Sequence, residues 1–199
     1  MAYAACMANR AHSADPRAER VRGRIRDAAF ALAHERPVDQ LTVGDIVTRA
    51  AVSRPVFYRH FRDRDDAVTY AFRVAFATAT ADIDGEPAGR ILALFDFAAD
   101  HRAMYRNIVP SAVAQPVVGA LRAELAPACE QIAVDAMPAV TTIAGLSPES
   151  VSRFLLGGFM EVLRSWMEDP EPGDLRVRVR AALDTVTALL GLSARAAAH

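Results

Sequence analysis

The chain has 199 residues, of which 52% are hydrophobic and 24% are charged, and its net charge at pH 7 is −1. This composition is typical of a folded globular protein, and it excludes a disordered chain or a strongly charged polyelectrolyte. No uncharged run is long enough to span a bilayer, and the N-terminus lacks the basic start and apolar block of a signal peptide, so we expect a cytoplasmic protein with no membrane partner.

The charges are distributed unevenly along the chain. Residues 1–66 hold 12 Arg against 9 acidic residues, whereas residues 67–199 hold 11 Arg against 15 acidic residues. A basic N-terminal part joined to an acidic remainder suits a nucleic-acid-binding head on a body with another task. A difference of this size also arises by chance, so it only supports other evidence.

The chain begins with a stretch rich in Ala, Asn, His and Ser, and residues 1–16 are expected to form a disordered tail. Arg10 and Arg17 are residues of the kind that touch a minor groove from a basic arm, but an unstructured tail is the simpler interpretation. A first helix is predicted from about residue 17 to 34. Val21, Ile25 and Leu32 lie on its apolar stripe, which would complete a small core beneath the segment that follows.

Residues 41–61, LTVGDIVTRAAVSRPVFYRHF, predict a short helix, a tight turn and a second short helix. Thr42 is a candidate N-cap of the first helix, with Asp45 three residues later completing a near-capping box. Ser53 is a candidate N-cap of the second, and Pro55 falls in its first turn, where a missing N–H does little harm. Such short helices are unstable alone and must be held by the rest of the fold.

This segment resembles the DNA-binding domain of the TetR family of transcriptional regulators. Its members commonly read T-x-x-D-I-A-x-x-A-G-V-S-x-x-x-x-Y-x-x-F followed by a short charged segment. The matching residues are Thr42, Asp45, Ile46, Ala50, Val52, Ser53, Tyr58 and Phe61, followed by residues 62–65. Val47 stands where the family has a small Ala, and Ala51 stands where it has Gly. The turn must therefore avoid a strongly left-handed backbone or tolerate strain at Ala51.

The resemblance implies that the second helix enters the major groove of double-stranded DNA. Arg54 and Arg59 are candidates for contacts to base edges, and Val56 for contact with a thymine methyl group. The candidates for phosphate contacts are Thr42, Ser53, Tyr58, His60 and Arg64. Arg64 matches a position where relatives place a phosphate-contacting Lys.

The rest of the chain has helical apolar periodicity and no alternating strand pattern. The predicted helices cover about residues 64–82, 87–99, 101–109, 114–136, 148–168 and 175–190. Pro127 is predicted to kink or split the helix over residues 114–136. The first is expected to act as a lever between body and head, as such a helix does in the family.

Together these patterns predict an all-α protein. A three-helix DNA-binding domain over residues 17–78 is joined to a bundle of six or so helices over residues 79–199, and the protein is a homodimer. The last two helices carry surplus apolar surface, and Gly157 and Gly158 permit the close approach of another helix. The predicted dimer-interface residues are Val151, Leu155, Phe159, Val162, Trp166, Val179, Leu183 and Val186. The alternative is that both helices pack only within the monomer.

The body also carries aromatic and Met residues with few charges between them, which suggests a pocket for an apolar or amphipathic small molecule. The candidate ligand-binding residues are Phe95, Met104, Tyr105, Gln131, Phe154, Phe159 and Met160, with Phe97, Met137 and Thr141 as further candidates. The alternative is that these side chains are ordinary core.

No motif for catalysis, a cofactor or a metal is present, and the five His residues lack metal-ligand spacing. Cys6 and Cys129 are expected to be reduced thiols, with a redox switch as the less favoured alternative. The sequence thus predicts a transcriptional regulator. The favoured form of this prediction is a repressor that is released from a palindromic operator by a small molecule. The alternative is a helical scaffold protein that has lost DNA or ligand binding.

Overall fold

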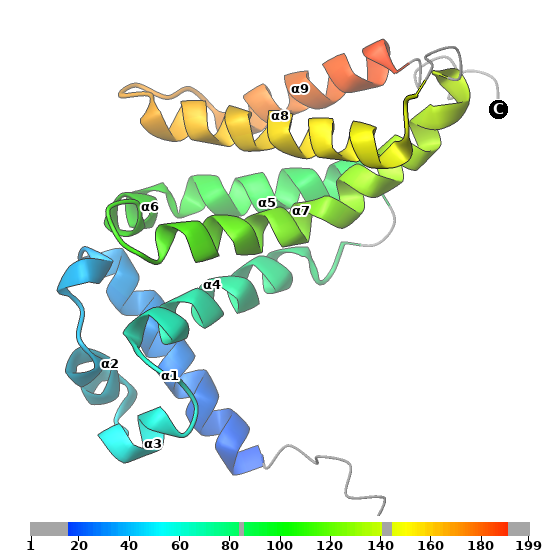
Figure 1. The fold of residues 1–199 in the computed structure, drawn as a ribbon. Helices are drawn as coiled ribbons and strands as arrows, with labels where there is room; N and C mark the ends of the chain where they lie inside the picture. The colour runs from blue at the N-terminus through cyan, green and yellow to red at the C-terminus, as the bar shows by residue number, and fades with distance from the viewer. Residues whose placement is uncertain (1–15, 84–85, 141–144, 191–199) are drawn as a thin grey trace, which may run out of the picture.

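The computed structural model describes residues 16–83, 86–140 and 145–190, and this part of the chain contains helices and turns but no strand (Figure 1). The α-helices are α1 (Pro16–Glu35), α2 (Val43–Ala50), α3 (Arg54–Tyr58), α4 (Arg64–Thr80), α5 (Pro87–Asp100), α6 (Arg102–Ile108), α7 (Ala114–Ala136), α8 (Pro148–Glu168) and α9 (Leu175–Leu189). Two single-turn 3-10 helices, η1 (Val38–Gln40) and η2 (Met137–Ala139), complete the described elements.

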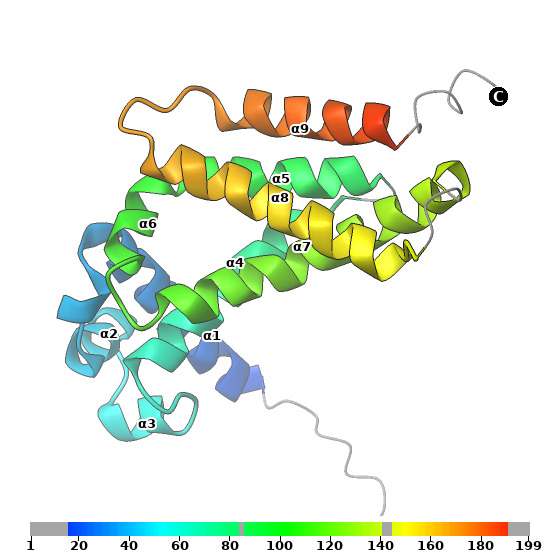
Figure 2. The same ribbon diagram turned by 45° about the horizontal axis from the view of Figure 1, so that its top comes forward.

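The helices form a small head and a layered body. Helices α1, α2 and α3 make the head, and α4 leads from α3 into the body beneath α5 and α7 (Figure 1). Helices α8 and α9 form the layer farthest from the head, with α8 packed on α7 and α9 packed on α5 (Figure 2). Since α4 packs on α1, α5 and α7, it belongs to the cores of both parts. No described helix is long and apolar enough to cross a membrane.

The head is assembled on fully buried side chains from each of its helices. Ile25 of α1, Ile46 of α2, Phe57 of α3 and Val68 of α4 are all 0% exposed. The buried residues continue without a break from these into the body, so the hydrophobic core is one connected cluster. This continuity gives the short helices of the head the external support that their length demands.

The body ends in a hairpin of α8 and α9 that is held by Arg102 at the start of α6. Its guanidinium donates to the backbone oxygen atoms of Met167 at 3.3 Å and Asp169 at 2.6 Å, which satisfies carbonyls at the C-terminal end of α8. The same guanidinium lies 5.0 Å from the ring centre of Trp166. The buried indole of Trp166 donates its N–H to the oxygen of Gly173 at 2.6 Å.

Most helix bounds agree with the sequence to within about two residues. Of the two outcomes expected at Pro127, splitting does not occur, because α7 is a single helix from Ala114 to Ala136. Pro127 lies on the exposed side of α7. The expected tail lies almost wholly outside the described residues, and α1 begins at Pro16.

Candidate nucleic-acid interface and internal cavity

The first local feature of the site is the N-terminus of α2. The Thr42 hydroxyl accepts from the Asp45 N–H at 3.1 Å, and the Asp45 carboxylate accepts from the Thr42 N–H at 2.8 Å, so the capping box is complete. The hydroxyl also donates to that carboxylate at 2.7 Å, and Arg36 pairs with its other oxygen at 2.8 Å. The bonds from Thr42 and Arg36 lower the pKa of Asp45 to about 2. The Thr42 hydroxyl proton, a predicted phosphate donor, is therefore already used in this cap.

The second feature is the turn between α2 and α3. Ala51 has φ 49° and ψ 52°, which places it in the left-handed region. The Ala51 N–H donates to the oxygen of Thr48 at 3.2 Å, and the Val52 N–H donates to the oxygen of Val47 at 3.0 Å. This bonding closes the C-terminus of α2 in the way a Gly usually does. The turn was expected either to avoid a left-handed backbone or to tolerate strain at Ala51, and the structure shows the left-handed, strained conformation.

The face of α3 that points away from the core carries most of the predicted DNA contacts. Ser53, at the N-cap position, makes no capping hydrogen bond with its side chain, and Tyr58 is 57% exposed. Arg54 and Arg59 are exposed, and neither guanidinium has an ion-pair partner among the described residues. The two remaining side chains on α3 and the turn after it, Val56 and His60, are half-buried. In Figure 2, α3 lies at the end of the molecule opposite α9.

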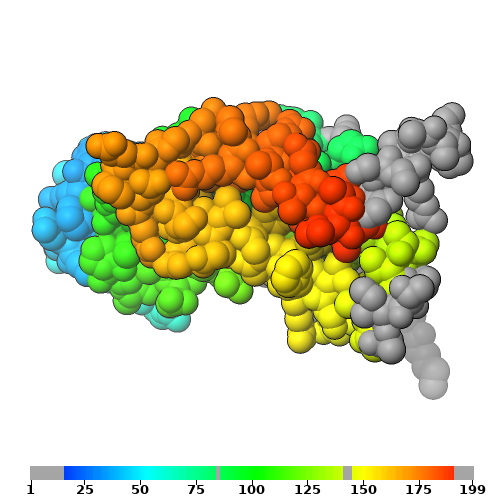
Figure 3. Space-filling view, turned by 90° about the horizontal axis from the view of Figure 1, so that it is seen from above, coloured from blue at the N-terminus to red at the C-terminus, as the bar shows by residue number. Residues whose placement is uncertain are grey.

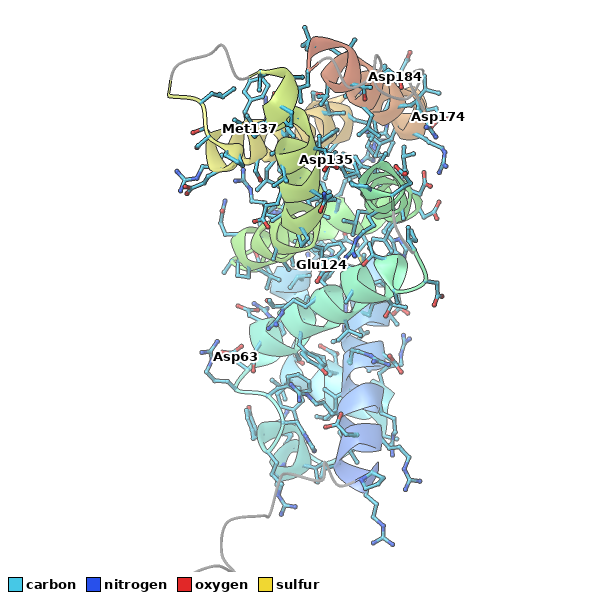
Figure 4. The ribbon with its side chains drawn as sticks, turned by 90° about the vertical axis from the view of Figure 1, so that its right-hand side faces the viewer. Asp63, Glu124, Asp135, Met137, Asp174 and Asp184 are labelled. Carbon is cyan, nitrogen blue, oxygen red and sulfur yellow. The ribbon has the colours of Figure 1, made fainter. Side chains whose placement is uncertain are left out.

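Arg64, a predicted phosphate contact, makes several hydrogen bonds within the chain. Its guanidinium donates to the backbone oxygens of Asp39 at 3.1 Å and Leu41 at 3.0 Å, and its Nε donates to Asp65 at 2.6 Å. Only 22% of its side chain is exposed. Arg64 thus ties the start of α4 to the segment before α2. Figure 4 shows the neighbouring N-cap residue Asp63 at this junction of head and body.

The body contains a cavity of about 320 Å³ between α4, α5, α6, α7 and α8. Its wall is mostly apolar, with ring and thioether side chains from four of these helices. The cavity is lined by Phe72, Phe76, Phe97, Ala98, His101, Met104, Tyr105, Ile108, Gln115, Val117, Val118, Leu121, Arg122, Gly157, Met160, Glu161, Leu163, Arg164 and Met167. Its size falls at the lower end of the range for pockets that hold small organic ligands.

The polar groups of the cavity gather where α7 and α8 reach the surface. Gln115 and Arg122 of α7 are exposed there, and Arg122 has no ion-pair partner among the described residues. On α8, Arg164 is neutralised by Glu161 at 2.5 Å and Glu168 at 2.7 Å. Tyr105 contributes a hydroxyl from α6, and burial raises its pKa, which keeps it a neutral hydrogen-bond donor.

An aromatic cluster connects this cavity to the head. The His101 ring stacks on Phe97 with centroids 4.0 Å apart, and both side chains line the cavity. His101 also lies 5.1 Å from His34 and 5.6 Å from Phe30, which belong to α1. Nearby, Asn107 of α6 donates to the oxygen of Ala33 at 2.9 Å, which fixes the last turn of α1. The cavity wall and α1 are therefore in direct contact.

The predicted ligand residues divide into two groups. Met104, Tyr105, Met160 and the further candidate Phe97 line the cavity. Phe95, Gln131, Phe154, Phe159 and Met137 do not, and Thr141 lies outside the described residues. Phe95 and Phe159 instead contact each other in the core, with ring centroids 6.1 Å apart. The sequence analysis did not name Phe72 and Phe76 of α4, which also line the cavity.

The predicted dimer residues lie mainly inside the monomer. Val151, Leu155, Phe159, Trp166, Val179 and Leu183 are buried, and Val162 and Val186 are half-buried. The six buried side chains pack on neighbouring helices of the same chain. The outer surfaces of the hairpin carry other apolar side chains: Phe154 is 75% exposed, Val177 64% and Leu189 76%.

The family sequence model described as bacterial regulatory proteins, tetR family, matches residues 25–68. No curated protein matches the chain in sequence. Among the residues that the structure describes, no group of three or more His, Cys, Asp or Glu side chains could hold a metal ion.

Solved structures resemble the chain over most of its length. A TetR transcriptional regulator from Streptococcus agalactiae 2603V has a TM-score of 0.60 at 16% identity, covering 85% of this chain and 95% of that one. The dihydroxyacetone kinase operon activator DhaS has a TM-score of 0.64 at 15% identity, covering 86% and 97%. A tetR-family regulator from Streptomyces coelicolor has a TM-score of 0.58 at 18% identity, covering 87% and 84%.

These structural likenesses establish the fold, and the matched segment contains the capped α2, the turn at Ala51 and the exposed α3. Residues 25–68 thus match the family of tetR regulatory proteins, and the chain shares its fold with solved structures described as TetR-family regulators.

Proposed function

We propose that this chain represses transcription as a homodimer that binds a palindromic operator through α3 and is released by an amphipathic small molecule. The observation that carries the DNA-binding part is the outer face of α3. There Arg54 and Arg59 are exposed and unpaired beside Ser53 and Tyr58. Free guanidinium groups on a helix that fits the major groove are the usual means of reading guanine edges.

Selection of binding sites from a random DNA pool tests this part of the proposal. We expect an inverted repeat, because two identical heads related by a two-fold axis must meet inverted half-sites. Arg54→Ala should weaken binding by about 1–3 kcal/mol and relax specificity at one base pair. Arg106→Ala is the control, since Arg106 is equally exposed but lies on α6 of the body. Equal operator affinity for both variants would contradict the assignment of α3.

The effector part of the proposal rests on the walls of the cavity. Phe72 and Phe76 belong to α4, which starts beside α3, and His101 touches α1 through His34 and Phe30. A ligand that displaces these rings would act at once on α1 of the head and on α4, which joins the head to the body. The apolar wall and the unpaired Arg122 at the surface favour a ligand with an apolar body and one polar or anionic end.

Release from DNA requires that the ligand prefer a head position that no longer matches the operator. A coupling of about 1–3 kcal/mol would weaken operator binding about 5–150-fold. Candidate ligands are found by a thermal-shift screen of amphipathic carboxylates, alcohols and amines. By linkage, operator DNA must then weaken ligand binding by the same factor. A ligand that binds in the cavity without changing operator affinity would separate the cavity from regulation.

The homodimer part of the proposal is supported by the outer side of the α8–α9 hairpin. Figure 3 shows these two helices side by side across one face of the molecule. Gly157 and Gly158 lie on α8 with no atom within 4 Å of where a Cβ would be, so no helix of the same chain uses the close approach they permit. Together with the exposed Phe154, they offer a place where a second copy could pack.

Activation in place of repression is the alternative supported by one comparison, because DhaS, which shares the fold, is described as an operon activator. Transcription from a promoter carrying the selected operator decides between the two. Repression predicts that the protein lowers transcription and that the ligand restores it. A scaffold protein without DNA binding is supported only if selection returns no preferred sequence.

A further inference from the structure

The turn between α2 and α3 contains a strained residue that the rest of the head must hold in place. Ala51 is the one non-Gly residue with positive φ among those the structure describes. Its Cβ crowds the backbone in this conformation, a cost that Gly would avoid. The turn also decides the angle between α2 and α3, since α3 follows after only Val52 and Ser53.

Arg24 reaches this turn from the middle of α1. Its Nε donates to the oxygen of Ala50 at 2.9 Å, and one terminal nitrogen donates both to that oxygen and to the oxygen of Ala51 at 2.5 Å. These carbonyls belong to the end of α2, where backbone oxygens lack helical partners and the helix dipole favours a positive charge. One guanidinium thus satisfies two consecutive carbonyls of a strained turn 26 residues away in sequence.

We infer that Arg24 is a positioning residue for DNA recognition: it holds Ala51 in its left-handed conformation and so fixes α3 relative to α2. This inference rests on the proposed DNA-binding function of α3. It differs from a phosphate contact because Arg24 acts through two backbone carbonyls of its own chain. A positioning residue changes operator affinity without changing the number of phosphates that the protein neutralises.

The test compares Arg24→Gln with Arg20→Gln on the selected operator at several salt concentrations. Arg20 lies one turn earlier on α1 and bonds only to the oxygen of Pro16 in its own helix, at 3.1 Å. We expect Arg24→Gln to weaken operator binding at least about tenfold, the loss typical of a charged hydrogen bond. The slope of log affinity against log salt concentration should stay at the wild-type value. A slope shallower by about 1 would show a lost phosphate contact and overturn the inference.

A rescue experiment separates positioning from a general loss of folding. Ala51→Gly removes the strain, so adding it to Arg24→Gln should restore most of the operator affinity. Ala81→Gly, at the exposed C-cap of α4 with φ −63°, is the matched control and should restore none. Such rescue is a non-additive coupling between residues in contact. Circular dichroism at the assay temperature checks that each variant is folded.

The outcomes distinguish this inference from the proposed function. If the wild-type protein selects no operator, the DNA-binding proposal itself fails. If it selects one, and Arg24→Gln binds as tightly as the wild type, only the positioning role is wrong. If Arg24→Gln alone is unfolded, the Arg24→Gln/Ala51→Gly double variant still decides. A double variant that is folded but binds the operator at least about tenfold more weakly than the wild type contradicts rescue.

Discussion

Single residues carry much of the strain and chemistry in this fold. Ala51 adopts a left-handed conformation that favours Gly, and Thr42 uses its hydroxyl in the cap of α2. The sequence identified both positions but not the conformation or bonding that each adopts. A residue type shows which conformations are unfavourable, but it does not show which of them the fold nevertheless adopts. The same holds for Arg24, whose interaction with α2 becomes visible only when α1 and the turn are seen together.

Replacing Ala51 by Gly should stabilise the protein, because Gly takes up positive φ without crowding. The expected gain is about 1 kcal/mol in the free energy of unfolding, reduced by the greater freedom of Gly in the unfolded chain. Urea unfolding followed by circular dichroism measures it. Ala81→Gly should lower the free energy of unfolding instead, since Ala81 has helical dihedral angles. Destabilisation by both changes would argue against strain at Ala51.

Cys129 should be chemically inert in the native protein. Its side chain is buried, and burial raises the pKa of its thiol to about 12, so the reactive thiolate is scarce at neutral pH. In a Cys6→Ser background, iodoacetamide at pH 8 should label Cys129 only after unfolding in urea. Rapid labelling of the folded protein would revive the redox interpretation of this residue.

At the scale of elements, helix caps and side-chain hydrogen bonds between elements determine the positions of the short helices. The sequence predicted the cap at Thr42, which forms, and one at Ser53, whose side chain makes no capping hydrogen bond. It predicted too long a second helix for the DNA-binding motif, because the residues after Tyr58 are compatible with helix. In the structure they form a tighter turn, in which the Arg59 N–H donates to the oxygen of Val56 at 3.2 Å.

Arg64 links the start of α4 to the segment before α2, a contact that the sequence did not predict. Arg64→Ala should lower the free energy of unfolding by about 1–3 kcal/mol, because a charged donor to two backbone oxygens is removed. Arg62→Ala is the control: its side chain is 81% exposed and pairs only with the adjacent Asp63. The salt slope of operator binding should be unchanged in Arg64→Ala. A shallower slope with unchanged stability would restore the phosphate contact implied by the family resemblance.

At the scale of the whole molecule, apolar stripes predicted the cores but not their partners. A buried helix face has the same periodicity whether it packs on its own chain or on a second copy. Val179 and Leu183 therefore suggested a dimer interface, although they lie in the monomer core. Phe95 was predicted to line a pocket but lies in the core, whereas Phe72 lines the cavity and was not predicted to. The sequence does not show which part of a buried stripe borders empty space.

The proposed assembly predicts that Phe154→Asp yields a folded monomer. Phe154 is 75% exposed in the single chain, so a charge there should oppose association without damaging the core. Val134→Asp is the control, because Val134 is 55% exposed on α7, outside the hairpin. Sedimentation at micromolar concentration gives the result. Wild-type protein that sediments as a monomer would rule out the homodimer. A charge at Phe159 does not test the assembly, because Phe159 is buried in the single chain and the change would disrupt folding.

The position of Trp166 gives the protein an optical signal of its own. It is the single tryptophan in the sequence, it is buried, and its neighbours Leu163 and Met167 along α8 line the cavity. All indole fluorescence therefore originates beside the cavity, with its emission shifted to the blue by the apolar surroundings and no contribution from the head. A titration of unlabelled protein should report occupancy of the cavity by a change in this emission, independently of any readout from DNA.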